Sequence, residues 1–170
     1  YTTTNVLYVP GLQSDTLTFT TPAPYQGISV LGFATEGSAT MDVKVRFSDG
    51  TTQLFSGVSL SDWFSGTNTV VVGFDRCNRS TGTPAYVGAA GNPRMYYVDL
   101  PLTCANSQKN ISRIVFQNTS GNARLCIMAA SGALAPVITA TSSPVTCQGG
   151  TNGSATVTVA NGLPPFTYTW

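Results

Sequence analysis

Side chains able to do chemistry are scarce in this sequence, and histidine is missing altogether. Without an imidazole, Ser-His-Asp and Cys-His catalysis are excluded and the commonest zinc ligand is lost. A glycosidase would instead need two carboxylates that face each other across a cleft. Asp49 belongs to a turn motif, Asp42 to an alternating strand, and the other acids occur singly beside expected strand ends, so the sequence favours a non-catalytic protein. The acidic residues are Asp15, Glu36, Asp42, Asp49, Asp62, Asp75 and Asp99.

The cysteines occur without C-x-x-C spacing, which argues against a zinc ribbon or a redox motif. In an exported protein the default is a disulfide. Cys77 and Cys104 both lie in polar, turn-rich sequence, and we predict that they pair. Cys126 lies inside the apolar stretch Leu125–Met128, and we expect it to pack as a buried thiol. No D-x-D-x-D-G loop is present, so we assign no metal and no cofactor, although calcium can stabilise such proteins.

Carbohydrate binding is the sharper functional hypothesis. Sugars present apolar C–H faces ringed by hydroxyls, so their sites pair an aromatic platform with planar hydrogen-bonding groups. These residue types gather on or beside a long polar segment, 77–93, and the candidate ligand-binding residues are Asp62, Trp63, Tyr86, Asn92, Arg94 and Tyr96. Some of them have a structural alternative: Trp63 could close one end of the fold, and Arg94 could brace the loop through Asp75 or Asp99. Tyr96 and Tyr97 point to opposite faces of one strand, so we expect one of them inside.

Composition indicates an exported protein. Hydrophobic residues make up 42% of the chain but charged residues only 9%, against roughly 25% in a typical soluble domain. The net charge is only +1 and the sequence has no run of basic residues, so nothing in it indicates binding of nucleic acid. No apolar run approaches the ~20 residues of a membrane span. Because the sequence begins with Tyr1 rather than Met, we interpret its start as a processed or cut boundary, and we expect a secreted or cell-surface location.

The clearest periodic pattern is the alternation of Met41–Phe47, in which apolar and charged residues face opposite sides. Ser48-Asp49-Gly50-Thr51 follows, and Asp-Gly is typical of a two-residue type I′ turn. That turn would place Thr52 opposite Phe47 and Leu54 opposite Val45. It therefore predicts that Leu54 shares the apolar face of the first strand.

Further strands follow at similar spacing, and no long 3.6-residue period occurs. Six to eight such strands predict an all-β fold, an antiparallel, jelly-roll-like β-sandwich. Ser61–Phe64 is expected to form one helical turn, and 77–93 a loop. The additional predicted strands are Thr16–Thr21, Ile28–Thr35, Thr69–Phe74, Arg94–Leu102, Ile111–Asn118 and Arg124–Ser131.

The pattern changes near residue 134, where we place a domain boundary. Residues 1–134 would form the sandwich module, and residues 135–170 a smaller unit with strands Val137–Thr141 and Ser154–Ala160. The second unit is too short to bury a stable core alone.

Two motifs in the tail carry a resemblance to a known family. Cys147-Gln-Gly-Gly-Thr-Asn-Gly-Ser-Ala-Thr-Val157 and Gly162-Leu-Pro-Pro-Phe-Thr-Tyr-Thr-Trp170 resemble the SprB-type repeat of large surface and secreted proteins of Bacteroidetes. The resemblance implies a partial Ig-like repeat, export, and further domains of the same polypeptide. It also implies that the natural partner of Cys147 lies in a second half-repeat that is missing here. The alternative is a bond between Cys147 and Cys126.

The first part of the chain more loosely resembles the jelly-roll modules attached to secreted carbohydrate-active enzymes and adhesins. The similar stretches are Phe47–Gln53, Asp62–Phe64, Met95–Pro101 and Arg124–Gly132. This resemblance implies a polysaccharide or cell-surface glycan as partner, used for substrate targeting or adhesion. A structural spacer without a small ligand is the alternative, and a hydrolase is the weakest of the three hypotheses.

Overall fold

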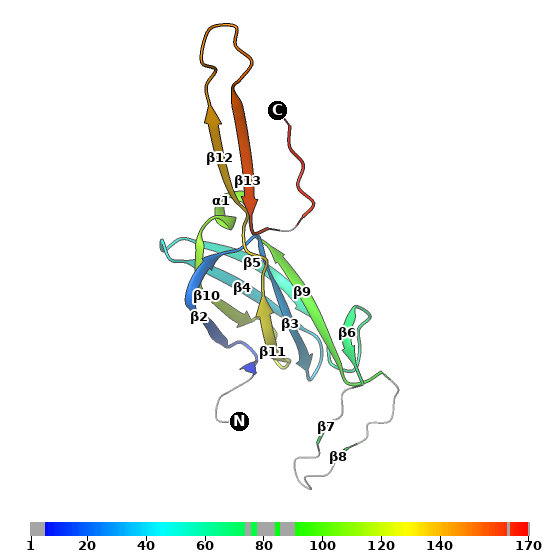
Figure 1. The fold of residues 1–170 in the computed structure, drawn as a ribbon. Helices are drawn as coiled ribbons and strands as arrows, with labels where there is room; N and C mark the ends of the chain where they lie inside the picture. The colour runs from blue at the N-terminus through cyan, green and yellow to red at the C-terminus, as the bar shows by residue number, and fades with distance from the viewer. Residues whose placement is uncertain (1–5, 74–75, 78–83, 86–90, 163, 170) are drawn as a thin grey trace.

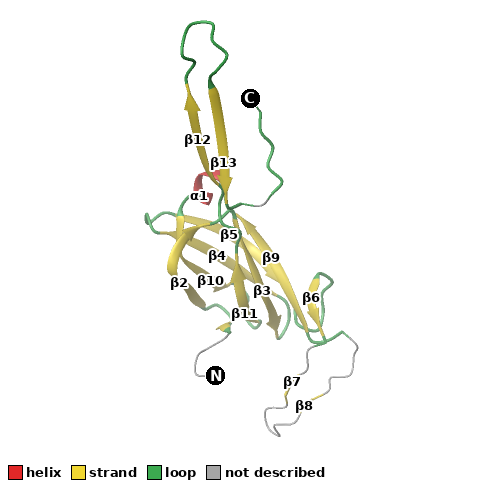
Figure 2. Cartoon of the chain, viewed as in Figure 1, coloured by secondary structure: helices red, strands yellow, loops and turns green. Residues whose placement is uncertain are grey.

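The fold is known from a computed structural model, which describes residues 6–73, 76–77, 84–85, 91–162 and 164–169. Two antiparallel sheets pack face to face, with strand orders β1-β11-β3-β9-β6 and β2-β10-β4-β5 (Figures 1 and 2). The prediction of an all-β sandwich is confirmed. The strands of the sandwich are β1 (Leu7–Val9), β2 (Ser14–Pro24), β3 (Gly27–Thr35), β4 (Ala39–Phe47), β5 (Thr52–Leu60), β6 (Thr69–Val72), β9 (Arg94–Pro101), β10 (Asn110–Asn118) and β11 (Arg124–Ser131).

The strand pairs are nested, and this gives the sandwich its jelly-roll topology. Hairpin β4–β5 is innermost, and it is enclosed in turn by the pairs β3–β9, β2–β10 and β1–β11. A long hairpin rolled so that its strands divide between two sheets is a jelly roll. Most of the predicted loop 77–93 lies outside the described residues, except for the short pair β7 (Arg76–Cys77) and β8 (Pro84–Ala85) and the stretch that begins at Gly91.

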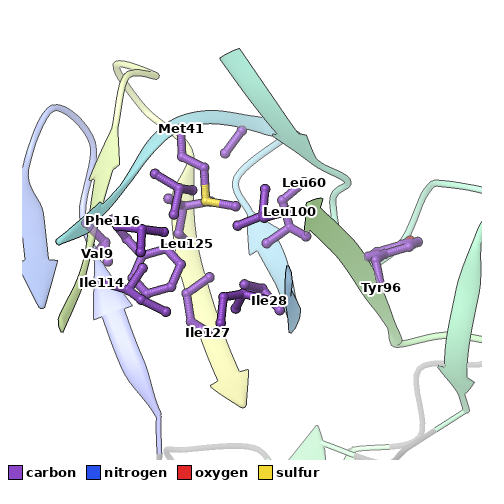
Figure 3. Close-up of a cluster of buried hydrophobic side chains, with 14 of the residues drawn as sticks. Val9, Ile28, Met41, Leu60, Tyr96, Leu100, Ile114, Phe116, Leu125 and Ile127 are labelled. Carbon is purple, nitrogen blue, oxygen red and sulfur yellow. The ribbon is translucent and has the colours of Figure 1, made fainter. Parts of the chain in front are cut away.

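The core fills the space between the two sheets, as Figure 3 shows. Strand β4 supplies alternate side chains to it, as the period-2 pattern predicts, and Val43 and Val45 are completely buried. Burial of one such aliphatic side chain stabilises the fold by roughly 1.5–3 kcal/mol. The facing sheet contributes partners of the same kind. The largest fully buried side chains are Phe116, Met41, Leu60, Ile111, Ile114, Leu125, Val9, Val30, Val43, Val45 and Asn118.

The turn of the β4–β5 hairpin differs from the prediction. The amide of Phe47 donates to the carbonyl of Thr51 (3.0 Å) and the amide of Gly50 donates to the carbonyl of Phe47 (3.1 Å). Gly50 has φ +85°, so the loop has three residues and ends on a left-handed glycine. The carboxylate of Asp49 holds this loop by accepting hydrogen bonds from the Thr51 amide (2.9 Å) and hydroxyl (2.6 Å). The predicted two-residue type I′ turn is wrong.

The longer turn shifts the hairpin register by one residue. Leu54 lies opposite Lys44 instead of Val45, and 51% of its surface is exposed. Phe55, opposite Val43, packs against the core in its place. Because side chains alternate across a strand, a slip of one residue moves every side chain to the other face. The predicted place of Leu54 on the apolar face is therefore also wrong.

The insertion at Ser61–Phe64, which we predicted as a helical turn, bridges to β3 at Asp62 and then makes one hydrogen-bonded turn, in which the amide of Ser65 donates to the carbonyl of Asp62 (3.0 Å). Ala34, near the end of β3, donates to the carbonyl of Ser61 and accepts from the amide of Trp63, both at 2.9 Å. The carbonyl of Trp63 in turn accepts a hydrogen bond from the amide of Arg94 at the start of β9 (2.7 Å). These residues lie between β3 and β9 and form hydrogen bonds with both strands, so the segment makes a single turn and does not continue as a helix. The helix of the described structure is the short α1 (Cys104–Ser107), which the sequence analysis missed.

The tail forms a separate two-stranded ribbon that projects from one end of the sandwich (Figure 1). Its strands are β12 (Val137–Ser143) and β13 (Ser154–Ala160). Hydrogen bonds join its base to the sandwich: the Ala135 amide donates to the carbonyl of Pro24 (3.1 Å), and the Gly162 amide donates to that of Leu134 (3.1 Å). A domain boundary near residue 134 stays a prediction.

Candidate functional site

The structure brings four of the predicted site residues together, at the insertion between β3 and β9. Tyr96 is one of them, but only 4% of its surface is exposed. Its hydroxyl lies 2.8 Å from the carbonyl oxygen of Asp62 and 3.0 Å from that of Ser65. Burial raises the pKa of the Tyr96 phenol. A buried ring cannot present a face to a sugar, so we exclude Tyr96 from the candidate binding surface.

Asp62 and Arg94 are also engaged in holding this part of the chain. The two carboxylate oxygens of Asp62 accept hydrogen bonds from the amides of Phe64 (2.9 Å) and Gly37 (3.0 Å). The guanidinium of Arg94 donates to the carbonyls of Gly91 (2.9 Å) and Gly66 (2.6 Å). Among the described residues, Arg94 therefore braces the segments around it through main-chain carbonyls rather than through Asp99, and Asp75 lies outside the described residues.

The ring of Trp63 belongs to an aromatic cluster. It stacks on Phe33 with ring centroids 5.6 Å apart and planes 10° apart, and Phe64 meets it edge-on at 5.3 Å. Trp63 is half-buried. Such pairs contribute about 0.5–1.5 kcal/mol beyond the area that they bury. The stack therefore holds Trp63 against Phe33 on the outer side of β3, and both the binding role of Trp63 and the alternative that it closes one end of the sandwich stay predictions.

The two remaining candidates are placed differently. Tyr86 lies outside the described residues. Asn92 is described, and its buried side-chain oxygen accepts no hydrogen bond from the described part of the chain. A binding role for either residue stays a prediction.

A more open surface lies on the outer face of the five-stranded sheet. Tyr97 points away from the core, with 54% of its surface exposed. Its neighbour across the sheet is Leu31, and the next outward pair is Asp99 with Ser29. We call this surface the β9 groove; it is lined by Gln26, Gly27, Ser29, Leu31, Val70, Tyr97, Asp99, Pro101, Ala129, Ser131 and Ala133.

The groove exists because side chains of unequal size stand side by side. On β9 the outward residues are large or polar, beginning with Tyr97, whereas the matching positions on β3 and β11 include Ser29, Ala129 and Ser131. Small side chains leave a low floor beside the taller β9 side. Two adjoining hollows result, of about 410 and 530 Å³, and both are lined by Ser29 and Asp99.

The hydroxyl of Ser29 donates a hydrogen bond to the carboxylate of Asp99 in the middle of this groove. Asp99 is exposed and is the one charged side chain among the described lining residues. The opposite outer face of the sandwich is different, because Arg46 lies opposite Arg113 there and Lys44 lies two residues along the same strand, on the same face. An aromatic ring, a carboxylate and hydroxyls thus lie over an open hollow on the outer face of the five-stranded sheet.

The sequence alone predicted one part of this arrangement. It separated Tyr96 from Tyr97 by strand alternation, and the structure confirms that one of the two is inside. The groove forms only when strands β3, β9 and β11 pair in one particular register, and no motif in the sequence encodes that register.

The cysteines and the acidic residues form no further site in the described structure. Cys104, Cys126 and Cys147 are free thiols, so the alternative Cys126–Cys147 bond is not formed. Cys126 lies on the outer face between Tyr8 and Phe33 rather than in the core, and partial burial raises its thiol pKa. The predicted Cys77–Cys104 disulfide is not formed either, since Cys104 is a free thiol; the side chain of Cys77 lies outside the described residues. No group of three or more potential metal ligands occurs among the described residues.

Comparison with known proteins bears on the tail. Residues 139–170 match the SprB repeat. The match covers ribbon β12–β13 except the first two residues of β12, together with the segment that follows, and it indicates an extracellular, adhesin-like module of a surface or secreted protein of Bacteroidetes. No curated protein and no solved structure matches the chain. No helix in the described residues is long and apolar enough to cross a membrane.

The SprB match does not reach the sandwich. The resemblance of the first 134 residues to modules of carbohydrate-active enzymes therefore stays a prediction, and so does the glycan partner that it implies. What the structure adds is a jelly-roll strand order and one outer face with a groove.

Proposed function

We propose that the sandwich is a non-catalytic glycan-binding module and that the β9 groove is its binding surface. The observation that carries the proposal is the exposed ring of Tyr97 over a hollow that also presents Asp99 and Ser29. The ring offers an apolar face to the C–H groups of a sugar, and the carboxylate and hydroxyl offer partners to its hydroxyls. Tyrosine provides this area with little loss of conformational entropy.

The extracellular context indicated by the SprB match agrees with such a role. A surface or secreted protein meets polysaccharides of cells and of its surroundings. Binding would then serve attachment to a surface or the targeting of a substrate to further domains of the same polypeptide.

Affinity gel electrophoresis of the whole chain in soluble polysaccharides, preceded by a glycan array, tests the proposal. We expect Tyr97→Ala to abolish the retardation that the wild type shows. Tyr8→Ala is the matched control, because Tyr8 is a tyrosine on the same face that is 47% exposed and does not line the groove. A Tyr97→Ala protein that is retarded as strongly as the wild type would contradict the assignment of the surface.

A structural spacer without a small ligand is the second candidate. It is favoured by the way the predicted binding residues are used: Trp63 stacks on Phe33, Tyr96 is buried, and Arg94 bonds to carbonyls. In this case Trp63→Ala lowers the melting temperature, and the wild type is retained by no glycan on the array or in the gel. Retention of the wild type by any polysaccharide would eliminate the spacer.

A hydrolase has the least support. Asp42, Asp49 and Asp62 each accept a hydrogen bond from a backbone amide, which explains them structurally. The tail matches a repeat of a non-catalytic, adhesin type.

A further inference from the structure

We infer that the β9 groove binds an internal stretch of an uncharged polysaccharide chain, which lies along strands β3 and β9. The inference rests on the proposed glycan binding and adds the ligand's length, direction and charge.

The length of the groove argues for a chain rather than a single sugar. Its two hollows share Ser29 and Asp99, so they follow each other along the strands. One hollow reaches Tyr97 and Leu31, and the other reaches Pro101 and Gly27. Tyr97 and Pro101 are four residues apart on β9, and Leu31 and Gly27 are four residues apart on β3. Four residues of a strand correspond to about 13 Å. This is longer than one pyranose ring, and the shared pair would lie beneath the junction between neighbouring sugars.

The direction of the ligand follows from the shape of the floor. Along β3 the lining residues are the small Gly27 and Ser29 and the larger Leu31 beside Tyr97, and along β11 they are Ala129 and Ser131. The larger side chains of β9 stand beside this floor. A chain that follows the strands touches Tyr97 at one end and Pro101 at the other, whereas a chain that crosses them would meet only one hollow. Both hollows open on the outer face of the sheet, so a bound chain is reached from solvent along its length.

The charge of the lining residues argues for an uncharged glycan. Among the described residues of the groove, Asp99 carries the one formal charge, and no lysine or arginine lines either hollow. Arg94, on the same strand as Tyr97, donates instead to the carbonyls of Gly66 and Gly91. A uronate or sulfate would therefore meet a carboxylate with no compensating cation, which is unfavourable for like charges.

The test is isothermal titration calorimetry of the whole chain with defined oligosaccharides. The probes are mono-, di-, tri- and tetrasaccharides of neutral β-glucan, xylan and mannan, with oligogalacturonates as the anionic series. We expect affinity in one neutral series to rise at least about tenfold from monosaccharide to tetrasaccharide, since the longer ligand fills both hollows. We expect no measurable binding of the oligogalacturonates.

Two filling variants separate the hollows. Ala129→Phe places a ring in the hollow beside Tyr97 and should remove binding of every ligand. Ala133→Phe fills the hollow beside Gly27 and should remove the advantage of the tetrasaccharide while the short ligands still bind. Thr16→Phe is the control, because Thr16 is exposed on strand β2 of the other sheet. Circular dichroism confirms that each variant is folded.

Asp99→Asn tests the charge argument. It keeps a planar hydrogen-bonding group but removes the negative charge, so we expect the ratio of neutral to anionic affinity to fall. An unchanged ratio would contradict the selection by charge. Equal affinity for monosaccharide and tetrasaccharide, or a preference for oligogalacturonates, would overturn this inference while leaving glycan binding intact. Absence of any glycan binding would overturn the proposed function as well.

Discussion

The hydroxyl of Tyr96 lies 2.8 Å from the carbonyl oxygen of Asp62, and this contact joins strand β9 to the segment inserted beside it. The next residue, Tyr97, points to the opposite face of the same strand and is exposed over the groove. The two neighbouring tyrosines thus differ in their roles: Tyr96 stabilises the fold, and Tyr97 is exposed on the outer surface. The division follows from the alternation of side chains along a strand.

Replacement of Tyr96 by phenylalanine should affect stability and leave binding unchanged. Tyr96→Phe keeps the buried ring and removes the hydroxyl that is bonded to Asp62, so we expect the free energy of unfolding to fall by about 1 kcal/mol. Urea denaturation followed by circular dichroism measures this change. The same variant should bind glycan as the wild type does. A loss of binding without a loss of stability would return Tyr96 to the candidate site.

The carboxylate in the β4–β5 turn should make stability depend on acid pH. Hydrogen bonds from Thr51, together with Lys109, lower the pKa of Asp49 from 3.8 to about 2. A group whose pKa is lower in the folded state adds stability above its unfolded pKa and loses it as the pH falls through the folded value. We therefore expect the melting temperature to fall as the pH is lowered from 4 to 2, and by less in Asp49→Asn. Parallel curves for the two proteins would show that the turn is not the cause.

Thiol reactivity should separate the three described free cysteines. Cys104 and Cys147 are exposed, whereas Cys126 is half-buried and its pKa is raised by that burial. The thiolate is the reactive form, so Cys126 should react more slowly with iodoacetamide at neutral pH than the other two. Mass spectrometry of peptides from a labelling time course gives the three rates. Equal rates after denaturation are the control, and an equally fast Cys126 in the folded protein would contradict the expectation.

Removal of the ribbon should leave the sandwich folded. The buried residues of the core lie between Val9 and Ala135, and none of the described residues of β12 or β13 is buried. A chain that ends at Pro136 should therefore unfold cooperatively, with a melting temperature within about 4 °C of the full chain. Differential scanning calorimetry measures both. A large loss would mean that the ribbon stabilises the sandwich and that the predicted boundary near residue 134 separates no independent unit.

Local patterns were enough to predict most of the strands. The alternation in Met41–Phe47 reports which side of a strand meets the core, because burial of apolar surface acts at each residue independently of the topology. The hairpin turn shows the limit of this reasoning. Asp-Gly is compatible with turns of two or three residues, and the choice depends on the hydrogen bonds that Asp49 and Gly50 make once the strands have paired.

The sequence by itself determined the all-β class, the alternation that separates Tyr96 from Tyr97, and the likeness of the tail to the SprB repeat, since each depends on residues close together in the chain. Only the tertiary structure decided that Tyr97 is the exposed tyrosine, that Trp63 stacks on Phe33, and that Ser29 and Asp99 meet in the middle of one groove. These relationships join strands that are up to 70 residues apart. Their geometry follows from strand register, which the packing of the whole sandwich sets and no local pattern encodes.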